Sequence, residues 1–355
     1  MAEKYFLGAM TRGGFSTEFG RIIGQEGYYT YILKGGPGTG KSSLMRRVAE
    51  HFEEEENVVR FFCSSDPESL DAVVLEGHKA IIVDGTSPHV FDPVYPGCSQ
   101  RIVDLGENWD GQKLQENAEG IKAFTDKNRS LHERVKRYQT ALSSVCGDTF
   151  SLAAGCVDEK KLGAFLQRFY KKILGKKGSG SGDRSIRQLT ALTEYGCMTQ
   201  TETLEDYLDV FTLTDDWYAC AHMLIEETAE EAVKRGYDII LCPAHAFNNE
   251  VWEHLLIPEA GTALVSCSPL TRLSVEGAGN LNLSRFYSKE KLQPSRQRLK
   301  LDRMTAETLA DEVYDTVRLA KRFHDDLESF YIAAMDHKAL DKVCEGIINE
   351  ISSRG

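Results

Sequence analysis

Residues 35–42 read Gly-Gly-Pro-Gly-Thr-Gly-Lys-Ser, which fits the spacing G-x-x-x-x-G-K-[ST] of a phosphate-binding loop. The four glycines allow the backbone to bend so that its N–H groups point inward around a chain of phosphates. Lys41 can then reach the β- and γ-phosphates, and Ser42 can place its hydroxyl on a bridging Mg²⁺. We expect the nucleotide to contact the whole loop: Gly35, Gly36, Pro37, Gly38, Thr39, Gly40, Lys41, Ser42 and Ser43.

The segments on either side of this loop have the patterns that such a loop requires. Residues 28–33 are aromatic and β-branched, which predicts a buried strand. Apolar residues after the loop recur at helical spacing, and they are Leu44, Met45, Val48, Ala49 and Phe52. The sequence therefore predicts strand, glycine loop and helix in that order, with the positive end of the helix dipole at the phosphates.

A second strand ends in a carboxylate at residues 80–84, Ala-Ile-Ile-Val-Asp. This pattern is typical of a Walker B strand, whose Asp holds Mg²⁺ directly or through water. An apolar run that ends in Asp-Gly also begins many turns, so the interpretation of Asp84 depends on the glycine loop upstream.

Asp66 follows a third predicted strand, residues 58–62. Ligands of open parallel sheets bind beyond the carboxyl ends of the strands, where Asp66 would position a water or an acceptor hydroxyl. The alternative is a structural role, in which Ser65 or Asp66 caps a helix that carries Pro67 and Leu70.

Other polar residues are weaker candidates for the same site. Thr86, His89 and Asp92 follow the second strand and could contact phosphate or substrate. No Glu follows Asp84, which favours a kinase-like site or a base on another strand, such as Asp66. Arg272 is a speculative arginine finger.

Composition places limits on the function. A chain of 355 residues with 41% hydrophobic and 27% charged residues is typical of a globular protein of two or three domains. A net charge of −12 argues against broad electrostatic binding to nucleic acid. Apolar runs are too short to span a bilayer, and the nine scattered cysteines indicate reduced thiols and a cytoplasmic location.

The chain resembles itself over a repeat of about 180 residues, which indicates a duplicated domain. The matches keep their order: residues 9–11 with 191–193, 61–63 with 240–242, 73–75 with 255–257, 113–115 with 291–293, and 152–154 with 332–334. We therefore expect an active domain at 1–174 (helical part about 100–174), a Gly/Ser linker at 175–184, and a second domain at 185–355 (helical part about 284–355). Helical pairs of this kind usually pack against their own domain.

The second copy lacks the features of a phosphate site. Residues 214–221 replace the glycine loop with Thr-Asp-Asp-Trp-Tyr-Ala-Cys-Ala. Counting along the two segments puts Cys220 in place of the lysine and Ala221 in place of the serine, and Ser266 falls near the counterpart of Asp84. We expect a pseudo-domain that keeps the fold and either stabilises or regulates the first site.

The motifs Gly-Gly-Pro-Gly-Thr-Gly-Lys-Ser-Ser, Cys-Ser-Ser-Asp-Pro and Ile-Val-Asp-Gly-Thr-Ser-Pro-His together resemble an uncharacterised bacterial family of tandem P-loop ATPases. The resemblance covers essentially the whole chain and implies ATP binding at Gly35–Ser43 in a cytoplasmic protein. Both halves carry a P-loop in such a family, so the loss at residues 214–221 puts cooperation between two nucleotides in doubt.

The sequence thus predicts an α/β protein with two P-loop-type parallel sheets, each flanked by helices and followed by a helical subdomain. The predicted activity is Mg²⁺-dependent ATP binding and hydrolysis in the first half, with Lys41, Asp66 and Asp84 as catalytic residues and Ser42 and Asp84 as metal ligands. The alternatives are a small-molecule or nucleoside kinase and a non-catalytic nucleotide switch with an unknown protein partner. No membrane insertion is expected.

Overall fold

The segments that flank the glycine loop form the expected strand and helix. The computed structural model describes residues 2–11, 14–17, 19–86, 90–175, 180–247 and 251–354. In it, β4 (Tyr29–Lys34) leads through the loop into α2 (Lys41–Phe52), whose buried face is formed by the predicted apolar residues. The other two predicted strands are also present, as β5 (Val58–Phe62) and β7 (Ala80–Asp84).

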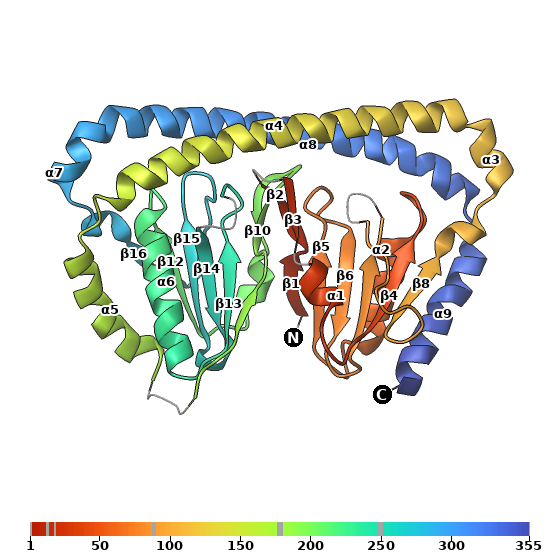
Figure 1. Cartoon of the computed structure of the whole chain (residues 1–355), viewed down its shortest axis with the longest axis horizontal. Helices are drawn as coiled ribbons and strands as arrows, with labels where there is room; N and C mark the ends of the chain where they lie inside the picture. Colours follow the sequence, from red (N-terminus) through yellow and green to blue (C-terminus); the bar gives the residue numbers. More distant parts are fainter. Residues whose placement is uncertain are drawn as a thin grey trace. The chain divides into compact units, whose positions relative to one another are not determined.

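The chain divides into two compact units, each with one six-stranded sheet (Figure 1). The first unit comprises Met1–Gly8, Thr17–Val135 and Asp315–Gly355, and the second comprises Ala9–Ser16 and Lys136–Tyr314. The long helices α4 (Ala118–Ala154) and α8 (Arg296–Ala334) each contribute to both units.

The first sheet has the strand order β1-β5-β6-β7-β4-β8. Its remaining strands are β1 (Ala2–Phe6), β6 (Leu70–Leu75) and β8 (Gln100–Asp104). The helices α1 (Phe19–Ile23) and α3 (Gly111–Glu116) belong to the same unit. Residues 100–104, which we assigned to a helical part, therefore form an edge strand, parallel to β4.

The second sheet has the order β16-β12-β15-β14-β13-β9, which is the same arrangement when each strand is matched to its counterpart in the first half. Its strands are β9 (Arg184–Ile186), β12 (Asp209–Thr214), β13 (Ile239–Pro243), β14 (Trp252–Ile257), β15 (Thr262–Cys267) and β16 (Gly279–Asn282). Two short hairpins also match: β2 (Gly8–Thr11) with β3 (Gly14–Thr17), and β10 (Thr190–Thr193) with β11 (Gly196–Thr199).

Both sheets are mixed, so the expectation of parallel sheets was wrong. β6 is antiparallel to both of its neighbours, β5 and β7, and β14 is likewise antiparallel to β13 and β15. The physical reason is the length of the connections. A parallel neighbour needs a crossover of a dozen or more residues, whereas only residues 63–69 and 76–79 separate β6 from the strands before and after it.

The last helix of each half packs on the sheet of the other half, so the expectation that helices pack on their own domain was also wrong. α9 (His337–Arg354) belongs to the first unit (Figure 1), where it contacts α2. Its Leu340, Cys344, Ile347 and Ile351 lie in the same buried core as the apolar residues of α2. Burial of the three larger side chains stabilises this unit by roughly 5–9 kcal/mol.

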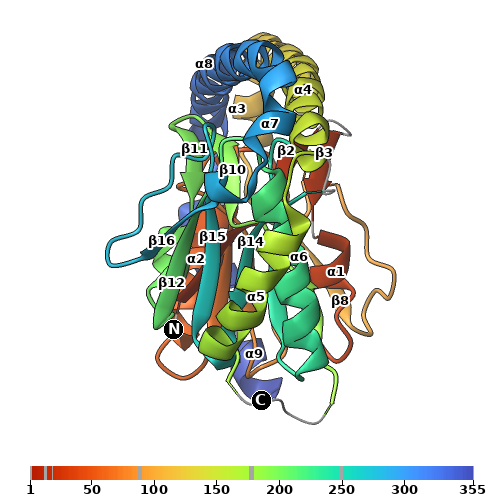
Figure 2. The same ribbon diagram turned by 90° about the vertical axis from the view of Figure 1, so that its left-hand side faces the viewer.

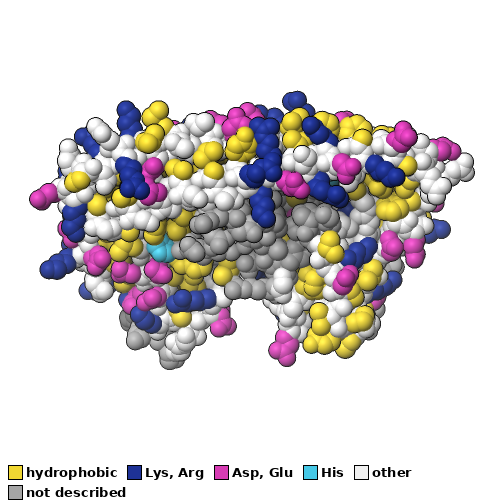
Figure 3. Space-filling model, turned by 45° about the horizontal axis from the view of Figure 1, so that its top comes forward, with side chains coloured by type: hydrophobic (Ala, Val, Ile, Leu, Met, Phe, Trp, Pro, Cys, Tyr) yellow, Lys and Arg dark blue, Asp and Glu magenta, His cyan; other side chains and the backbone are white. Residues whose placement is uncertain are grey.

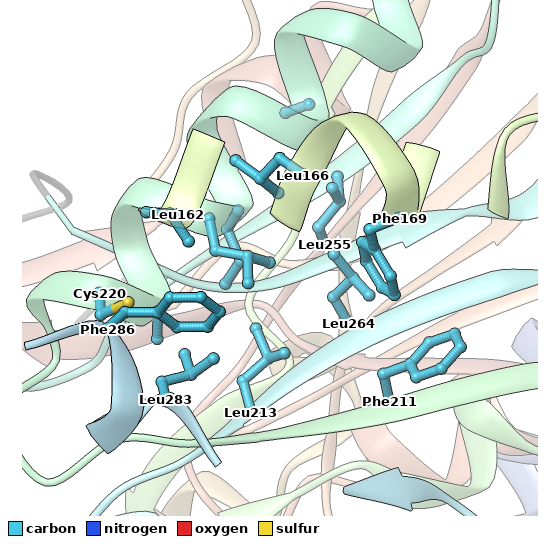
Figure 4. Close-up of a cluster of buried hydrophobic side chains, with 14 of the residues drawn as sticks. Leu162, Leu166, Phe169, Phe211, Leu213, Cys220, Leu255, Leu264, Leu283 and Phe286 are labelled. Carbon is cyan, nitrogen blue, oxygen red and sulfur yellow. The ribbon is translucent and has the colours of Figure 1, made fainter. Parts of the chain in front are cut away.

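In the second unit, too, the sheet is covered by the last helix of the other half of the chain. α5 (Glu159–Ile173) lies beside α6 (Ala219–Lys234) over the sheet (Figure 2). Leu162, Leu166 and Phe169 of α5 point into a core that Phe211 and Leu213 of β12 complete (Figure 4). α7 (Lys289–Leu292) precedes α8 in this unit, and Lys176–Ser179 of the predicted linker lie outside the described residues.

No helix in the described part of the chain combines the length and the apolar character needed to cross a membrane. On the face drawn in Figure 3, acidic and basic side chains are interspersed, and neither sign forms a continuous region.

Candidate phosphate-binding site

The glycine loop leaves the sheet at the carboxyl end of β4, between the neighbouring strands β7 and β8. Gly38 has a φ of 70° and Gly40 a φ of 82°, which is the left-handed region where glycine avoids a steric penalty. Gly40 is also the residue that precedes α2, so its conformation turns the backbone directly into the helix.

Lys41 is the first residue of α2, and its side chain folds back over the loop. Its ammonium donates to the carbonyl oxygens of Gly35 (3.0 Å) and Gly36 (2.8 Å) and lies 3.6 Å from Asp84 Oδ2. Lys41 is only 8% exposed, and a buried ammonium needs such partners. The structure thus brings together the predicted lysine and the predicted Walker B carboxylate.

Asp84 ends β7 directly beside β4, where it pairs with Leu33. Its Oδ1 accepts hydrogen bonds from the backbone N–H (2.8 Å) and the hydroxyl (2.6 Å) of Thr86. Oδ2 remains directed to Lys41. Thr86 therefore orients the carboxylate, whereas Ser87, Pro88 and His89 lie outside the described residues.

Ser42 lies one residue further along α2. Its Oγ accepts a hydrogen bond from the backbone N–H of Leu70 at 2.9 Å, which ties the start of α2 to the start of β6. The hydroxyl proton and a second lone pair on this oxygen are still available, so Ser42 retains the capacity to bind a metal ion.

The backbone N–H groups of the loop are suited to bind an anion. Among residues 36–42, the N–H of Gly38 has a hydrogen-bond acceptor, and the other N–H groups have none in the described part of the chain. The N–H groups of Thr39, Gly40, Lys41 and Ser42 form the positive end of α2, where a phosphate is the natural acceptor.

A carboxylate from α8 makes the contact with Gly38. Glu328 Oε1 accepts the Gly38 N–H at 3.1 Å and lies 3.4 Å from His324 Nε2. The hydrogen bond with His324 lowers the pKa of Glu328, and the bond from Gly38 contributes in the same direction against the effect of burial. Glu328 therefore holds a negative charge against the glycine loop.

α8 and α9 also pack tightly against the backbone of the loop. A Cβ atom would lie 2.9 Å from Tyr331 if added to Gly36, 2.7 Å from the Glu328 carbonyl oxygen if added to Gly38, and 2.5 Å from Leu340 if added to Gly40. The glycines are thus needed for this packing as well as for the turn. Sequence reasoning missed Glu328 and Tyr331, because no local pattern relates α8 to the loop.

Asp66 has structural partners in the turn between β5 and β6. Its backbone oxygen accepts from Ser69 N–H and its Oδ2 accepts from Ser69 Oγ, both at 2.8 Å. Lys321 Nζ of α8 lies 3.5 Å from the same carboxylate oxygen. The predicted helix after Pro67 is absent, since Leu70 begins β6. Lys321 and Glu328 are seven residues apart on α8, so the contacts of this helix with Asp66 and with Gly38 are separated by about 10 Å along its axis.

The corresponding loop of the second unit contains its own carboxylate. Asp215 is 3% exposed, and it accepts hydrogen bonds from Trp217 N–H (3.0 Å), Ala221 N–H (2.9 Å) and the Tyr287 hydroxyl (2.9 Å). An internal anion thus uses the donors that a phosphate would need at the start of α6. The predicted loss of the second site therefore has a physical cause beyond the missing lysine.

The register of this second loop differs from the expected one. α6 begins at Ala219 after Tyr218, whose φ of 66° matches that of Gly40 before α2. By this alignment Ala219 takes the place of Lys41 and Cys220 that of Ser42, one residue earlier than predicted, because the loop is shorter. The prediction for Ser266 is confirmed: it pairs with Leu213 as Asp84 pairs with Leu33.

A buried polar cluster occupies the second sheet near this loop. Glu253 Oε2 lies 3.6 Å from His245 Nδ1 and 3.6 Å from His254 Nε2. Burial lowers the pKa of His254 to about 4, against the effect of Glu253. His254 accepts from Ser266 N–H through Nδ1 and contacts Thr190 Oγ1 through Nε2, which is the pattern of a neutral ring.

The remaining candidates are not joined to the glycine loop. Arg272 belongs to the second unit, where its guanidinium lies 3.5 Å from Glu307. Asp92 pairs with Lys34 at 3.4 Å. Within the described residues no three or more His, Cys, Asp or Glu side chains form a metal-binding group. Comparisons with family models, with curated proteins and with solved structures found no significant match.

Proposed function

We propose that Gly35–Ser43 binds the phosphates of ATP together with Mg²⁺, and that the first unit hydrolyses the nucleotide. The observation that carries this proposal is the set of unsatisfied N–H groups at the start of α2, beside a lysine that lies 3.6 Å from a strand-end aspartate. A helix N-terminus with a lysine and glycines around it is suited to a phosphate chain.

Each residue has a defined role in the proposed reaction. The loop N–H groups bind phosphate oxygens. Lys41 contacts the β- and γ-phosphates, since one of the three N–H donors of its ammonium makes no hydrogen bond in the described structure. Ser42 and Asp84 would hold Mg²⁺, and the bound ion would supply positive charge to stabilise the charge on the transferring phosphoryl group. Asp66 orients the attacking water and accepts its proton.

A non-catalytic nucleotide switch is the second candidate, and the contact between Glu328 and Gly38 favours it. A phosphate that approaches Gly38 displaces this carboxylate, since two anions cannot share one donor without strong repulsion. Nucleotide binding would then release Glu328 of α8 and alter how α8 packs. In this case a protein partner, rather than hydrolysis, would respond to the nucleotide.

We also propose that the two halves of the chain are copies of one P-loop-type unit, of which the second no longer binds a nucleotide. Support comes from the shared strand order, the shared strand directions and the left-handed residue before α2 and before α6. A cytoplasmic location, where ATP and Mg²⁺ are abundant, remains part of the proposal.

The experiment that tests the proposed function is a measurement of phosphate released from MgATP by the purified chain. Lys41→Ala is the blank, because it removes the ammonium and puts a residue of high helix propensity at the start of α2. Steady release that disappears in Lys41→Ala supports an ATPase. Calorimetric binding of MgATP without release supports the switch, and the absence of both binding and release contradicts the proposal.

A further inference from the structure

A cavity of about 810 Å³ lies in the second unit, and the glycine loop does not line it. Its wall combines residues of the loop before α6, of α7, of α4 and of the first turns of α8. Ligand pockets for small molecules have volumes of about 300–1,000 Å³. The cavity therefore has the size of a binding site for a small organic molecule.

Basic side chains line one side of this cavity. Arg296, Lys300 and Arg303 follow one another at spacings of four and three residues, so they lie on one face of α8, and Lys289 of α7 joins them. Arg303 is shared between Asp216 (3.7 Å) and Glu307 (3.3 Å). Lys289, Arg296 and Lys300 have no ion-pair partner in the described part of the chain.

The spacing of these cations in α8 makes their charge unfavourable. Arg296 and Lys300 are four residues apart, so their charges lie side by side on the helix. Like charges at this spacing repel each other, and a bound anion would relieve the repulsion. The charge on this side of the cavity is thus complementary to an anionic group.

The lining also includes apolar and aromatic side chains. Trp217 and Tyr218 contribute to it, together with the buried side chains of Leu270 and of Leu299, which shares the face of α8 with the cations. The backbone of Trp217 is held by Asp215, and its ring packs at 86° to that of Tyr287 with 4.7 Å between the ring centroids. A ring that is fixed in this way offers a flat apolar surface to a planar ligand.

We propose that this cavity binds a small organic anion with a planar apolar body, such as a phosphate, sulfonate or carboxylate on a ring system. The donors at the start of α6 are already satisfied by Asp215, so the anionic group of the ligand pairs instead with Arg296 and Lys300, and its ring packs on Trp217. This site is separate from the proposed nucleotide site and does not depend on it.

The test compares two fluorescent probes that differ in charge. Anilinonaphthalene sulfonate is a planar anion, and N-phenyl-1-naphthylamine is its uncharged analogue. Both would be titrated into the full chain, into Arg296→Glu/Lys300→Glu, and into Trp217→Ala. The matched control is Lys160→Glu/Arg168→Glu, which makes the same charge change at two exposed positions of α5 in the same unit. Circular dichroism would verify the fold of each variant.

We expect the Arg296→Glu/Lys300→Glu variant to bind the sulfonate about tenfold or more weakly while its affinity for the uncharged probe stays unchanged. The control should bind both probes as the parent does, and Trp217→Ala should weaken both. Unchanged sulfonate binding in the α8 variant, or an equal loss in the α5 control, would overturn the proposal.

Discussion

The backbone N–H of Gly38 donates to the carboxylate of Glu328 at 3.1 Å, although 290 residues separate the two along the chain. The contact brings a negative charge from α8 to the loop that we propose for phosphate binding. A nucleotide that binds at this loop would therefore compete with an acidic side chain of the same protein. The strength of that competition can be measured, because the charge can be removed with almost no change in shape.

Glu328→Gln is expected to bind MgATP about three- to tenfold more tightly than the parent chain. The amide keeps the shape of the side chain but no longer repels the phosphates at Gly38. Isothermal titration calorimetry measures the difference. Asp311→Asn removes the same charge from an exposed position of α8 in the second unit and should leave the affinity unchanged. Weaker binding by Glu328→Gln would show that the carboxylate assists the nucleotide.

Asp66→Asn is expected to retain nucleotide binding and to lose most of the hydrolysis rate. The amide still accepts the Ser69 hydroxyl bond but cannot take a proton from water. A general base contributes about 10²–10⁴-fold to a rate, so phosphate release should fall by roughly this factor. Ser69→Ala removes the hydroxyl partner of Asp66 and keeps its carboxylate. Normal turnover in Asp66→Asn would remove the catalytic assignment.

The exchange of α5 and α9 between the halves of the chain predicts where core substitutions act. Ile347→Ala should destabilise the first unit by about 2–4 kcal/mol, because Ile347 of α9 is 2% exposed and packs in the core beneath α2. Ile173→Ala on α5 should destabilise the second unit similarly. Hydrogen exchange can assign each loss to a sheet. Leu301, which is 63% exposed, provides the control, since Leu301→Ala should cost less than about 0.5 kcal/mol.

Ile347→Ala would speed exchange in β12 and β15 if α9 packed on the sheet of its own half. Faster exchange in β4 and β7 is the result that the structure predicts.

The neutral ring of His254 contributes to the free energy of unfolding, and we expect this contribution to be lost in mild acid. Its pKa of about 4 lies below the ordinary value of about 6.5, so the neutral ring stabilises the fold above pH 6.5, and this contribution is lost as the pH falls towards 4. Between pH 7.5 and pH 5 the loss is about 2 kcal/mol. Urea unfolding measures the free energy of unfolding at pH 7.5 and at pH 5. The difference between the two values should be smaller by this amount in His254→Gln than in the parent chain. The matched substitution of the exposed His337, His337→Gln, should leave this difference unchanged.

The sequence predicted the local elements of the site because they depend on local chemistry. The glycines of the loop, the apolar run before Asp84 and the helical spacing after Lys41 each specify an element from within a few residues, and β4, α2 and β7 formed as expected. The pairing of Leu33 with Asp84 then places the aspartate beside the loop. Whether these residues bind ATP stays a prediction.

The features that the sequence could not predict arise between distant segments. The buried stripe of α9 shows that the helix is amphipathic, but the stripe is equally compatible with either sheet. The direction of β6 is set by the short connections before and after it, and we interpreted one of these as a helix start. Glu328 lies on an ordinary charged face of α8, and only the packing of α8 on the loop gives it a function.

The packing of α9 on the first unit also has a consequence for biosynthesis. The residues of the glycine loop emerge early from the ribosome, but the core beneath α2 is complete only after Leu340–Ile351 have been made. The first sheet must therefore persist without its last helix through most of translation, with part of its apolar surface exposed. The second sheet, in contrast, has α5 and all its strands before residue 315, so it can be completed before the first. A chain cut between its halves would leave each sheet without the helix that covers it.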